Sequence, residues 1–541
     1  MPNDPSIVQY HQQSKHHLHA YARGPGQLDW ASQPDPFRRY EGATLIPLQH
    51  LPPEDKPLYA PAFVVGQLEA EPMNRKSVSQ LFYDSLALSA WKLAGEIRWS
   101  LRVNPSSGNL HPTEGYLICG PVEGLSKLPM VCHYAPKEHA LERRAVFPVE
   151  SWRLLTSGLP KQSILIGLSS IYWREAWKYG ERAFRYCQHD VGHAIGAMSI
   201  AAAGLGWEAL LLDDIGYDSL EELLGLFDQT GPDAEHPDCL LAVFPHRTGA
   251  SEPTLTEEHL SNIKNLSWEG RPNALSSRHV SWPAIDEASA TCRKPTTNRI
   301  YGIKKQSGRV LKGDAEPISL RKMIHQRRSA VDFDGHTRLT REGFYQMLLK
   351  TLPVPGQVPF NTLPWNPVAH LGLFVHRVED LDPGLYFLLR DITQIDNLKS
   401  EMKKDFDWIR PQGCPEGLDL YQLAIGDARQ LAEQISCGQK IASDGCFSLG
   451  MIIEFEQSLK LYGEWFYSRL YWECGAIGQV LYLEAEAQGI RGTGIGCFFD
   501  EPVHSVFGFK GLKWQSLYHF TIGGPVEDLR LTVLPAYGGV E

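Results

Sequence analysis

Three short stretches of this chain combine residue types that can hold a ligand or stabilise an anion. The first runs from Arg102 to Glu114 and gathers Ser106, Ser107 and Asn109 around a glycine, just before an expected strand. Short polar side chains and exposed backbone amides on one surface suit a planar polar heterocycle or a phosphate. An ordinary turn before a hairpin has the same composition, and the residues alone leave both interpretations open.

A second stretch offers positive charge. Arg327, Arg328 and Ser329 follow one another at the end of a short amphipathic helix. Two guanidiniums and a hydroxyl in sequence can clamp a phosphate, because arginine presents forked donors to a dianion. A solvated basic end of a helix, favoured by the helix dipole, is the alternative.

The third stretch is Gly494-Ile495-Gly496, where glycine lets the backbone approach a ligand closely. It ends a helix and opens a strand, which is the reverse of the order in a dinucleotide-binding fingerprint. His189 and His193 also stand four residues apart on an expected helix, a spacing that can bind a metal ion. No third ligand is evident nearby, so we expect the two histidines to pack or cap and no metal to bind.

Composition and charge limit the kind of protein that presents these groups. Hydrophobic residues make up 43% of the 541 residues and charged residues 21%, which is ordinary for a globular protein. The net charge of −11, without a long block of like charge, argues against a nucleic-acid partner. We expect no membrane contact, because there is no signal-peptide pattern and no apolar run of roughly 20 residues. The ten cysteines lack C-x-x-C spacing, which fits a reducing cytoplasm rather than a zinc site or a disulfide framework.

The elements that must position these groups occur twice in the chain. Tyr179-Gly180-Glu181 recurs 283 positions later as Tyr462-Gly463-Glu464. The same offset relates four further pairs: Gly192 and Gly475, Ala202 and Ala485, Gly206 and Gly489, and Gly225 and Gly508. Two alanine-rich helices could look alike by composition, but their glycines would not then align. The register therefore indicates a tandem duplication.

Both copies follow one order of elements. The pattern turns helical at 77–94, and each copy has a long helix of small residues, at 190–203 and 473–487, that ends at a glycine. Apolar strand-like runs surround these helices, at 114–119, 130–134, 209–212 and 239–244 in the first copy and at 369–376, 384–389, 493–499 and 516–522 in the second. We therefore predict an α+β fold in which helices pack on a mixed, mostly antiparallel sheet in each copy.

This division gives four segments. Residues 1–60 form an irregular N-terminal arm, 61–250 the first domain, 251–317 a linker and 318–541 the second domain. The linker is rich in Ser, Thr, Asn and Pro and has few apolar clusters, so we expect it to wrap over the surface.

As a set, these motifs resemble the nitroreductase superfamily, and most of all its branch of SagB/ThcOx-type dehydrogenases, which oxidise azolines to azoles. The likeness is carried by 102–114, by the N-terminal strings at 10–17 and 35–43, and by 177–194. It covers nearly the whole chain apart from the linker. Since nitroreductase sites form at homodimer interfaces, the resemblance implies two tandem nitroreductase-like domains that form a pseudo-dimer within one chain. The chain is then a monomer or part of a higher homo-oligomer.

The resemblance also implies a cofactor, FMN. Asn109 would hydrogen-bond the pyrimidine edge of the flavin, and Ser106 and Ser107 would face its ring or ribityl chain. The other cofactor-binding positions that it implies are Arg102, Arg327, Arg328, Ser329, Gly494, Ile495, Gly496 and Arg530.

Lys178 and Tyr179 resemble the pair proposed to transfer a proton in azoline dehydrogenases. A desolvated lysine can remove a proton from carbon while hydride leaves for the flavin, and a tyrosine can share that proton. The alternative is an exposed lysine beside a core tyrosine.

Each copy lacks a motif that the other keeps. Pro359–Pro367 replaces the Ser/Asn stretch in the second copy, and Leu461 replaces the lysine. The first copy offers Arg38-Arg39 and Arg75-Lys76 in place of Arg-Arg-Ser, and its run Glu208–Leu212 has no glycines. We therefore expect one composite FMN site, with the Ser/Asn stretch from one copy and the arginines from the other.

The sequence thus predicts an FMN-dependent oxidoreductase, most similar to SagB/ThcOx-type dehydrogenases, acting on a peptide-derived or small heterocyclic substrate. An NAD(P)H-dependent nitro- or quinone reductase would use the same flavin. A flavin-poor pseudoenzyme that serves as a binding scaffold would show a similar erosion of motifs. Oxidation of NAD(P)H and the presence of bound flavin would distinguish the three.

Overall fold

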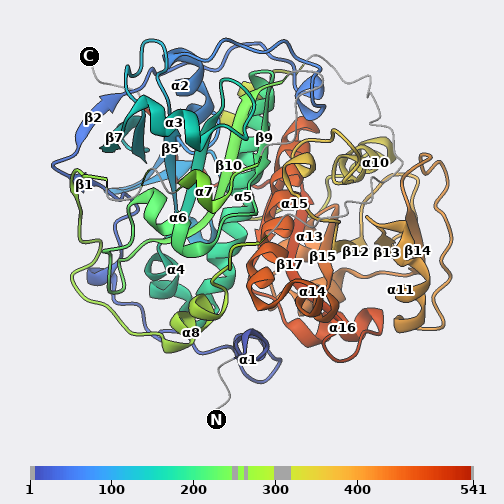
Figure 1. The fold of residues 1–541 in the computed structure, drawn as a ribbon. Coiled ribbons are helices and arrows are strands. Elements are labelled where there is room, and N and C mark those ends of the chain that lie inside the picture. The colour runs from blue at the N-terminus through green and yellow to red at the C-terminus, as the bar shows by residue number, and fades with distance from the viewer. Residues whose placement is uncertain (1–5, 247–253, 261–262, 264–265, 298–317, 538–541) are drawn as a thin grey trace.

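The computed structural model describes residues 6–246, 254–260, 263, 266–297 and 318–537. Two halves lie side by side, the N-terminal half from blue to green and the C-terminal half from yellow to red (Figure 1). Each half has its own antiparallel sheet with helices packed on it. The predicted α+β architecture in two tandem halves is confirmed.

The two sheets share one strand order. The sheet of the first half runs β2 (Thr44–Pro47), β7 (Ala140–Val146), β6 (Met130–Ala135), β5 (Thr113–Cys119), β8 (Ile164–Ser170), β10 (His236–Pro245) and β9 (Trp207–Leu211). The sheet of the second half runs β14 (Leu420–Ile425), β13 (Gly384–Leu388), β12 (Ala369–Val375), β15 (Phe447–Glu454), β17 (Trp514–Gly523) and β16 (Arg491–Ile495). Apart from the added edge strand β2, each strand has a counterpart at the same position of the other sheet, so the duplication extends to topology.

The helices repeat as well. The corresponding pairs are α4 (Tyr172–Tyr179) and α14 (Phe455–Tyr462), α5 (Ala183–Gly204) and α15 (Tyr467–Ala487), and α6 (Tyr217–Leu224) and α16 (Asp500–Phe507). The others are α1 (Ile7–Gln13), α2 (Arg75–Tyr83), α3 (Val149–Leu155), α7 (Glu257–Leu260), α8 (Pro283–Thr291), α9 (Leu320–Gln326), α10 (Arg341–Lys350), α11 (Ile395–Glu401), α12 (Arg429–Ile435) and α13 (Ile441–Asp444). Both long helices begin before the predicted residues, because the 3-10 turns η4 (Gly180–Arg182) and η8 (Glu464–Phe466) lead directly into them.

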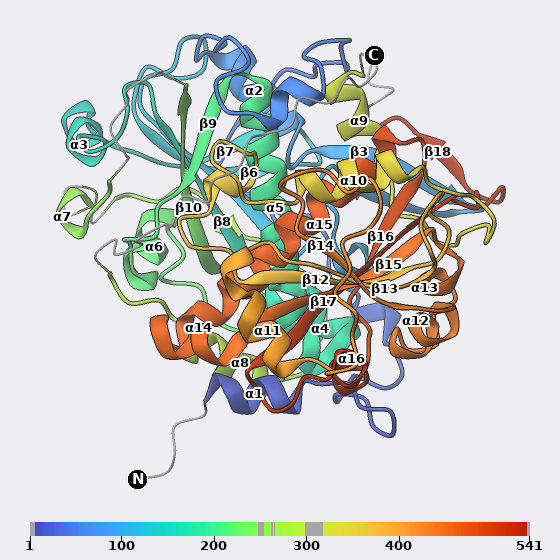
Figure 2. The ribbon, with the colours of Figure 1, turned by 90° about the vertical axis from the view of Figure 1, so that its right-hand side faces the viewer.

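The predicted helix at 77–94 is wrong in its second half. Helix α2 ends at Tyr83, and Leu88–Ala94 is a strand, β3. The chain turns at Gly95, where φ is +60°, and returns as β4 (Ile97–Arg102) to pair with β3. On its other edge β3 pairs with β18 (Thr532–Leu534), so the C-terminal strand reaches across to the first half (Figure 2). Pairing with the adjacent strand β4 and the distant strand β18 outweighs the local helical pattern here.

The segments outside the two halves are more structured than expected. Within the predicted linker, α7 and α8 form, and β11 (Arg271–Pro272) pairs with β1 (Tyr40–Glu41) of the arm. Residues 298–317 lie outside the described residues. Helix α1 packs on the second half, where His11 Nε2 lies 3.0 Å from Gln515 Oε1 and Lys15 forms an ion pair of 2.6 Å with Glu501. The arm therefore ties one half to the other.

Helices α5 and α15 cross between the two halves at a pair of glycines (Figure 1). A Cβ atom on Gly192 would lie 2.4 Å from the carbonyl oxygen of Trp472 and 2.9 Å from Cα of Gly475. A Cβ atom on Gly475 would lie 2.3 Å from the carbonyl oxygen of His189. The obstructing atoms are backbone atoms, so a side chain at either position would separate the helices. The two glycines that align in the repeat are thus what brings the halves together.

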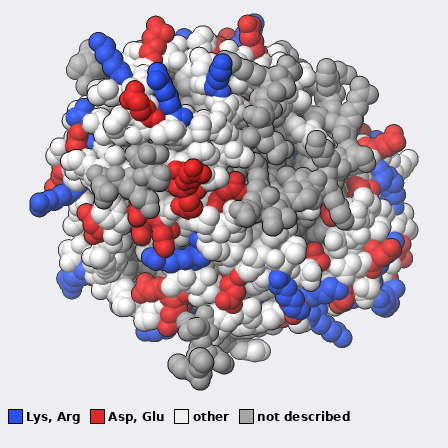
Figure 3. Space-filling model, in the orientation of Figure 1, with Lys and Arg blue, Asp and Glu red and all other residues white. Residues whose placement is uncertain are grey.

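The surface carries mixed charge. Figure 3 shows basic and acidic side chains interspersed over one face of the molecule. Among the described helices, none is long and apolar enough to span a bilayer.

The glycine contact gives a stability prediction. Gly192→Ala and Gly475→Ala should each lower the free energy of unfolding by about 2 kcal/mol or more, because overpacking against backbone cannot be relieved by a rotamer change. Thermal and urea unfolding measure the effect. Gly24→Ala is the control, since a Cβ atom there meets nothing within 4 Å. Equal unfolding midpoints for all three variants would contradict the prediction.

Candidate functional site

A cavity of about 460 Å³ lies between the two halves, beside α5 and α15. The first half contributes the Ser/Asn turn, defined here as residues 104–111, and the second contributes the end of α9 and the end of β16. The structure brings eleven of the predicted site residues together in this cavity: Arg102, Ser106, Ser107, Asn109, Tyr179, Arg327, Arg328, Ser329, Gly494, Ile495 and Gly496. The cavity is therefore composite, with walls from both copies.

Hydrogen bonds within the first half fix the Ser/Asn turn. The Ser107 N–H and hydroxyl both donate to the carboxylate of Asp190 on α5, over 3.1 and 3.3 Å. Asn109 donates from Nδ2 to the Ser100 carbonyl over 2.9 Å, and its Oδ1 lies 3.0 Å from His111 Nε2. The side chains that we expected to face a flavin are thus engaged within the protein. Their role in this geometry is to shape the turn.

Two buried carboxyl groups stand behind the turn. Burial raises the pKa of Asp190 to about 7, although hydrogen bonds from Ser106 and Ser107 act in the opposite direction. Burial, followed by the charge of Asp190, raises the pKa of Glu175 on α4 well above its usual range. Near neutral pH Glu175 is therefore protonated and Asp190 is protonated in part, which limits the negative charge beside the cavity.

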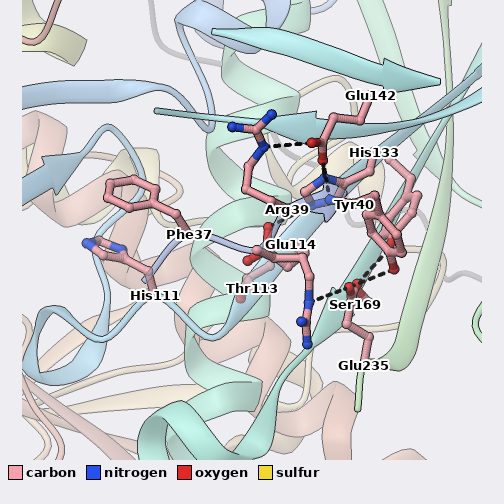
Figure 4. Close-up of polar contacts among 12 residues, drawn as sticks. Phe37, Arg39, Tyr40, His111, Thr113, Glu114, His133, Glu142, Ser169 and Glu235 are labelled. Carbon is pink, nitrogen blue, oxygen red and sulfur yellow. Dashed lines mark hydrogen bonds and ion pairs between the residues drawn. The ribbon is translucent and has the colours of Figure 1, made fainter. Parts of the chain in front are cut away.

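A buried chain of charges connects the turn to the sheet, and Figure 4 shows its part on the sheet, from Glu114 through His133 to Glu142. Arg174 donates to the His111 carbonyl over 2.7 Å and forms an ion pair with Glu114 at the start of β5. His133 lies between Glu114 and Glu142, with ring nitrogens 3.0 and 2.9 Å from their oxygens. Burial disfavours charge on His133, but hydrogen bonds to both carboxylates outweigh it and raise the pKa to about 9. The histidine is therefore charged and holds the two acids together.

Arg38 and Arg39, which the sequence offered in place of Arg-Arg-Ser, belong to this network. Arg39 donates to Glu142 over 2.6 Å, and Arg38 Nε lies 3.2 Å from Glu235 (Figure 4). Arg75, the other arginine considered, donates to the carbonyl of Pro47 on the surface. These arginines hold the arm against the first sheet. The candidates for a phosphate clamp are therefore Arg327 and Arg328 of the second copy.

Arg327 reaches the cavity from the end of α9 and is almost fully buried. Its guanidinium lies 5.0 Å from the centre of the Tyr482 ring, and Nη2 donates to the Arg102 carbonyl over 3.1 Å. Among the described residues, its Nε and Nη1 have no hydrogen-bond partner. Burial lowers the pKa of Arg327, and burial followed by the charge of Arg327 lowers that of Arg328 to about 10. Buried donors of this kind are costly, and an anion in the cavity would satisfy them.

The end of β16 forms the part of the wall beside the arginines, because Ala330 donates to the Gly492 carbonyl over 3.1 Å. Gly494 donates its N–H to the Tyr482 hydroxyl over 3.0 Å, and Ser329 donates to the same oxygen over 3.0 Å. A Cβ atom on Gly494 would lie 1.9 Å from the Tyr518 hydroxyl, and one on Gly496 would lie 2.4 Å from the ring of Tyr186. These glycines therefore make room for tyrosines, which is a different reason from the close approach to a ligand that we expected.

Lys178 and Tyr179 end α4 and meet the turn at Gly108. A Cβ atom on Gly108 would lie 2.6 Å from the Tyr179 hydroxyl and 3.1 Å from Lys178 Nζ. Tyr179 lines the cavity, whereas Lys178 contacts Gly108 of the turn and does not line the cavity. Burial, followed by the charge of Glu175, raises the pKa of Tyr179 well above its usual range, so its hydroxyl stays protonated.

Arg530 does not join the cavity. Its side chain is 88% exposed and forms an ion pair of 2.8 Å with Asp528. A surface arginine paired in this way is not placed to clamp a ligand in the cavity.

Sequence reasoning did not assign Asp190, His193, Tyr482 or Tyr518 to the site, although all four line the cavity. His193 Nε2 lies 3.0 Å from the Tyr518 hydroxyl, and burial lowers the pKa of His193 to about 3, so the ring is neutral. The sequence shows that His193 lies four residues after His189 on a helix, but only the fold shows that His193 faces Tyr518 and the cavity. In the described part of the chain, no cluster of three or more metal-ligating side chains forms.

The equivalent position on the other side of α5 and α15 is filled. By the offset of 283, Asp213 corresponds to Gly496 and Arg469 to Tyr186, and these two residues form a buried ion pair of 2.6 Å. Trp365, from the segment that replaces the Ser/Asn turn, donates to Glu473, the counterpart of Asp190, over 3.2 Å. The space that remains there is about 40 Å³. One side of the molecule is therefore open and its counterpart is closed.

Comparison with known proteins agrees with this fold. Residues 72–243 match the model of the Nitroreductase family. A putative nitroreductase from Anabaena variabilis is similar over 96% of this chain and 100% of that chain, with a TM-score of 0.69 and 21% identity. The microcin synthetase McbBCD complex of E. coli, with truncated pro-MccB17 bound, covers 42% of this chain and 80% of that chain, with a TM-score of 0.27 and 18% identity. No curated protein matches the chain.

The segment that matches the family model begins just before α2 and ends in β10. It therefore contains the Ser/Asn turn, α4 and α5, which carry the first half's share of the cavity. The likeness to the Anabaena protein extends over both halves. Residues 72–243 thus match the Nitroreductase family, and the two halves together share the fold of a putative nitroreductase.

Proposed function

We propose that the chain is an FMN-dependent dehydrogenase of the SagB/ThcOx type that binds one FMN in the composite cavity. The observation that carries this proposal is the guanidinium of Arg327, buried at the cavity with two donors unpaired among the described residues. Arg328 and Ser329 also line the cavity beside it, and a phosphate there would meet the unpaired donors of Arg327 next to the positive charge of Arg328. The motif resemblance favours a peptide-derived or small heterocyclic substrate.

The cavity suits a flavin in size and chemistry. Its volume of about 460 Å³ lies within the usual range for small-molecule sites. Aromatic side chains of Tyr186, Tyr482 and Tyr518 line it together with the polar backbone of the Ser/Asn turn. The fit therefore combines an anion clamp at one end with flat aromatic and amide surfaces elsewhere.

Bound FMN would supply the two-electron oxidation, and the protein would orient the substrate and move its proton. The Tyr179 hydroxyl, at the cavity wall, can accept a hydrogen bond from a reacting group and pass a proton on. Lys178 Nζ, which lies against the same side of Gly108 as the Tyr179 hydroxyl, can take that proton. Neutral His193 and partly protonated Asp190 add hydrogen-bonding groups with less than one full negative charge.

The filled counterpart of the cavity predicts the stoichiometry. Protein purified without added cofactor, or reconstituted with excess FMN and desalted, should contain one FMN per chain. The ion pair of Arg469 with Asp213 occupies the equivalent space on the other side. Absorbance near 450 nm against protein concentration, and native mass spectrometry, measure the ratio. Two flavins per chain would contradict the composite site, and none after reconstitution would favour a binding scaffold.

The arginine clamp predicts a loss of affinity. Arg327→Met keeps an unbranched side chain against Tyr482 but removes the charge, and it should raise the Kd for FMN by about 10- to 100-fold, as expected for one charge-assisted hydrogen bond. Fluorescence titration of the flavin-free protein gives the Kd. Arg530→Met is the matched control, because Arg530 is exposed and paired with Asp528 outside the cavity. Equal Kd values for both variants would remove Arg327 from the phosphate site.

The Lys178 and Tyr179 pair predicts a catalytic defect without loss of cofactor. Lys178→Met should slow anaerobic bleaching of bound FMN by a thiazoline- or oxazoline-bearing peptide by about 10²- to 10⁴-fold, because a general base is lost. FMN content should stay at the wild-type value. Lys460→Met serves as the control, since Lys460 lies on α14, the counterpart of α4, and pairs with Glu456 at the surface. Bleaching by NADPH but not by the peptide would instead indicate a nitro- or quinone reductase.

A further inference from the structure

One edge of the cavity wall carries two cysteines that lie far apart in the sequence. Cys497 follows Gly496 at the end of β16 and lines the cavity, and Cys437 lies just beyond α12. Two contacts bracket the pair: the Phe499 N–H donates to the Ile435 carbonyl over 2.8 Å, and Gln439 Nε2 donates to the Cys497 carbonyl over 2.9 Å. The two segments therefore run side by side with the cysteines between these contacts.

The backbone at Cys437 is held in an unusual conformation. Its φ is +55°, in the left-handed region that side chains other than glycine rarely adopt. Such conformations cost about 1 kcal/mol or more and persist where the surroundings impose them. Both cysteines are partly exposed, whereas most of the other cysteines are buried. Solvent therefore reaches a pair of thiols at the cavity edge.

A histidine completes this group. His16 accepts the Ala22 N–H at Nδ1 over 3.0 Å, and burial lowers its pKa, so the neutral ring carries its proton on Nε2. That nitrogen is then a donor toward Cys497. Hydrogen bonding with Cys437, and then with His16, lowers the pKa of the Cys497 thiol, while the contact with Cys497 raises that of Cys437. One thiolate beside one thiol is the arrangement that a reactive dithiol requires.

We propose that Cys437 and Cys497 form a redox-active pair that carries electrons from the flavin site to a small disulfide. The inference rests on the proposed FMN-dependent function and supplies the oxidant that such a dehydrogenase needs. Reduced flavin gives two electrons and one proton to the Cys437–Cys497 disulfide; the S–S bond breaks and leaves the Cys497 thiolate and the Cys437 thiol. The Cys497 thiolate then attacks an external disulfide and releases one thiolate. Cys437, on losing its proton, attacks the mixed disulfide, releases the second thiol and restores the internal bond.

The pair can be tested first without flavin. Flavin-free protein is equilibrated in buffers of oxidised and reduced glutathione, free thiols are alkylated, and the peptides are mapped by mass spectrometry. A linked peptide joining Cys437 to Cys497, lost on reduction, is the expected result. Cys414→Ser is the control and should give the same linked peptide, because Cys414 is partly exposed but lies elsewhere, against the Leu418 carbonyl. Two singly glutathionylated cysteines with no linked peptide would overturn the proposal.

The electron path is tested with bound FMN. Wild-type protein is photoreduced without oxygen and mixed with oxidised glutathione, and the return of absorbance near 450 nm is followed. Wild type and Cys414→Ser should recover at the same rate, and Cys437→Ser and Cys497→Ser at least about 10-fold more slowly. Unfolding midpoints within a degree or two of wild type exclude misfolding of the serine variants. Recovery in Cys437→Ser at the wild-type rate would overturn the electron path while leaving FMN binding intact. If the chain binds no FMN, the proposed FMN-dependent function and the electron path both fail. The peptide map, which needs no flavin, then shows whether Cys437 and Cys497 still form a disulfide.

Discussion

The packing of α5 against α15 at Gly192 and Gly475 is the constraint on which the rest of the molecule depends. The backbones meet so closely there that even a Cβ atom would collide with carbonyl oxygen or Cα atoms. This approach sets how far apart the two sheets lie, and hence the space left beside the helices. A cavity shared by both halves exists only because the halves are held at this distance.

Within this nearly symmetric frame the two sides of the helix pair have diverged. On one side the Ser/Asn turn, the arginines and the β16 glycines leave an open cavity, and on the other the Arg469–Asp213 pair fills the equivalent space. A buried ion pair is tolerated because each charge satisfies the other, and removing one partner would leave the other uncompensated. The closed side is therefore stable without a ligand. The open side keeps polar groups, such as the donors of Arg327, that need a ligand as their partner.

The open cavity lowers the stability of the protein when no ligand is bound. Arg327 holds donors that find no partner among the described residues, and Asp190 and Glu175 are buried with raised pKa values. The charged network from Arg174 to His133 keeps the neighbouring turn in place in spite of this cost. Groups that are unsatisfied until a ligand binds are typical of functional sites, where stability is lower than it could be. The cysteine pair at the cavity edge adds a second reactive group to the same region.

The sequence alone determined the duplication, the α+β class and eleven of the residues that line the cavity. A glycine register and local motifs carry that information, because helix and strand periodicity and turn chemistry are local properties. It did not determine that Leu88–Ala94 is a strand, since one of the two strands that pair with it, β18, lies more than 400 residues away in the chain. Nor did it reveal that Arg530 is outside the cavity or that the Asn109 side chain is bonded to Ser100 of β4 and to His111. Only the tertiary structure places Asp190, Tyr518 and the Cys437–Cys497 pair around one space, because their proximity comes from helix crossing and strand order, which no local pattern encodes.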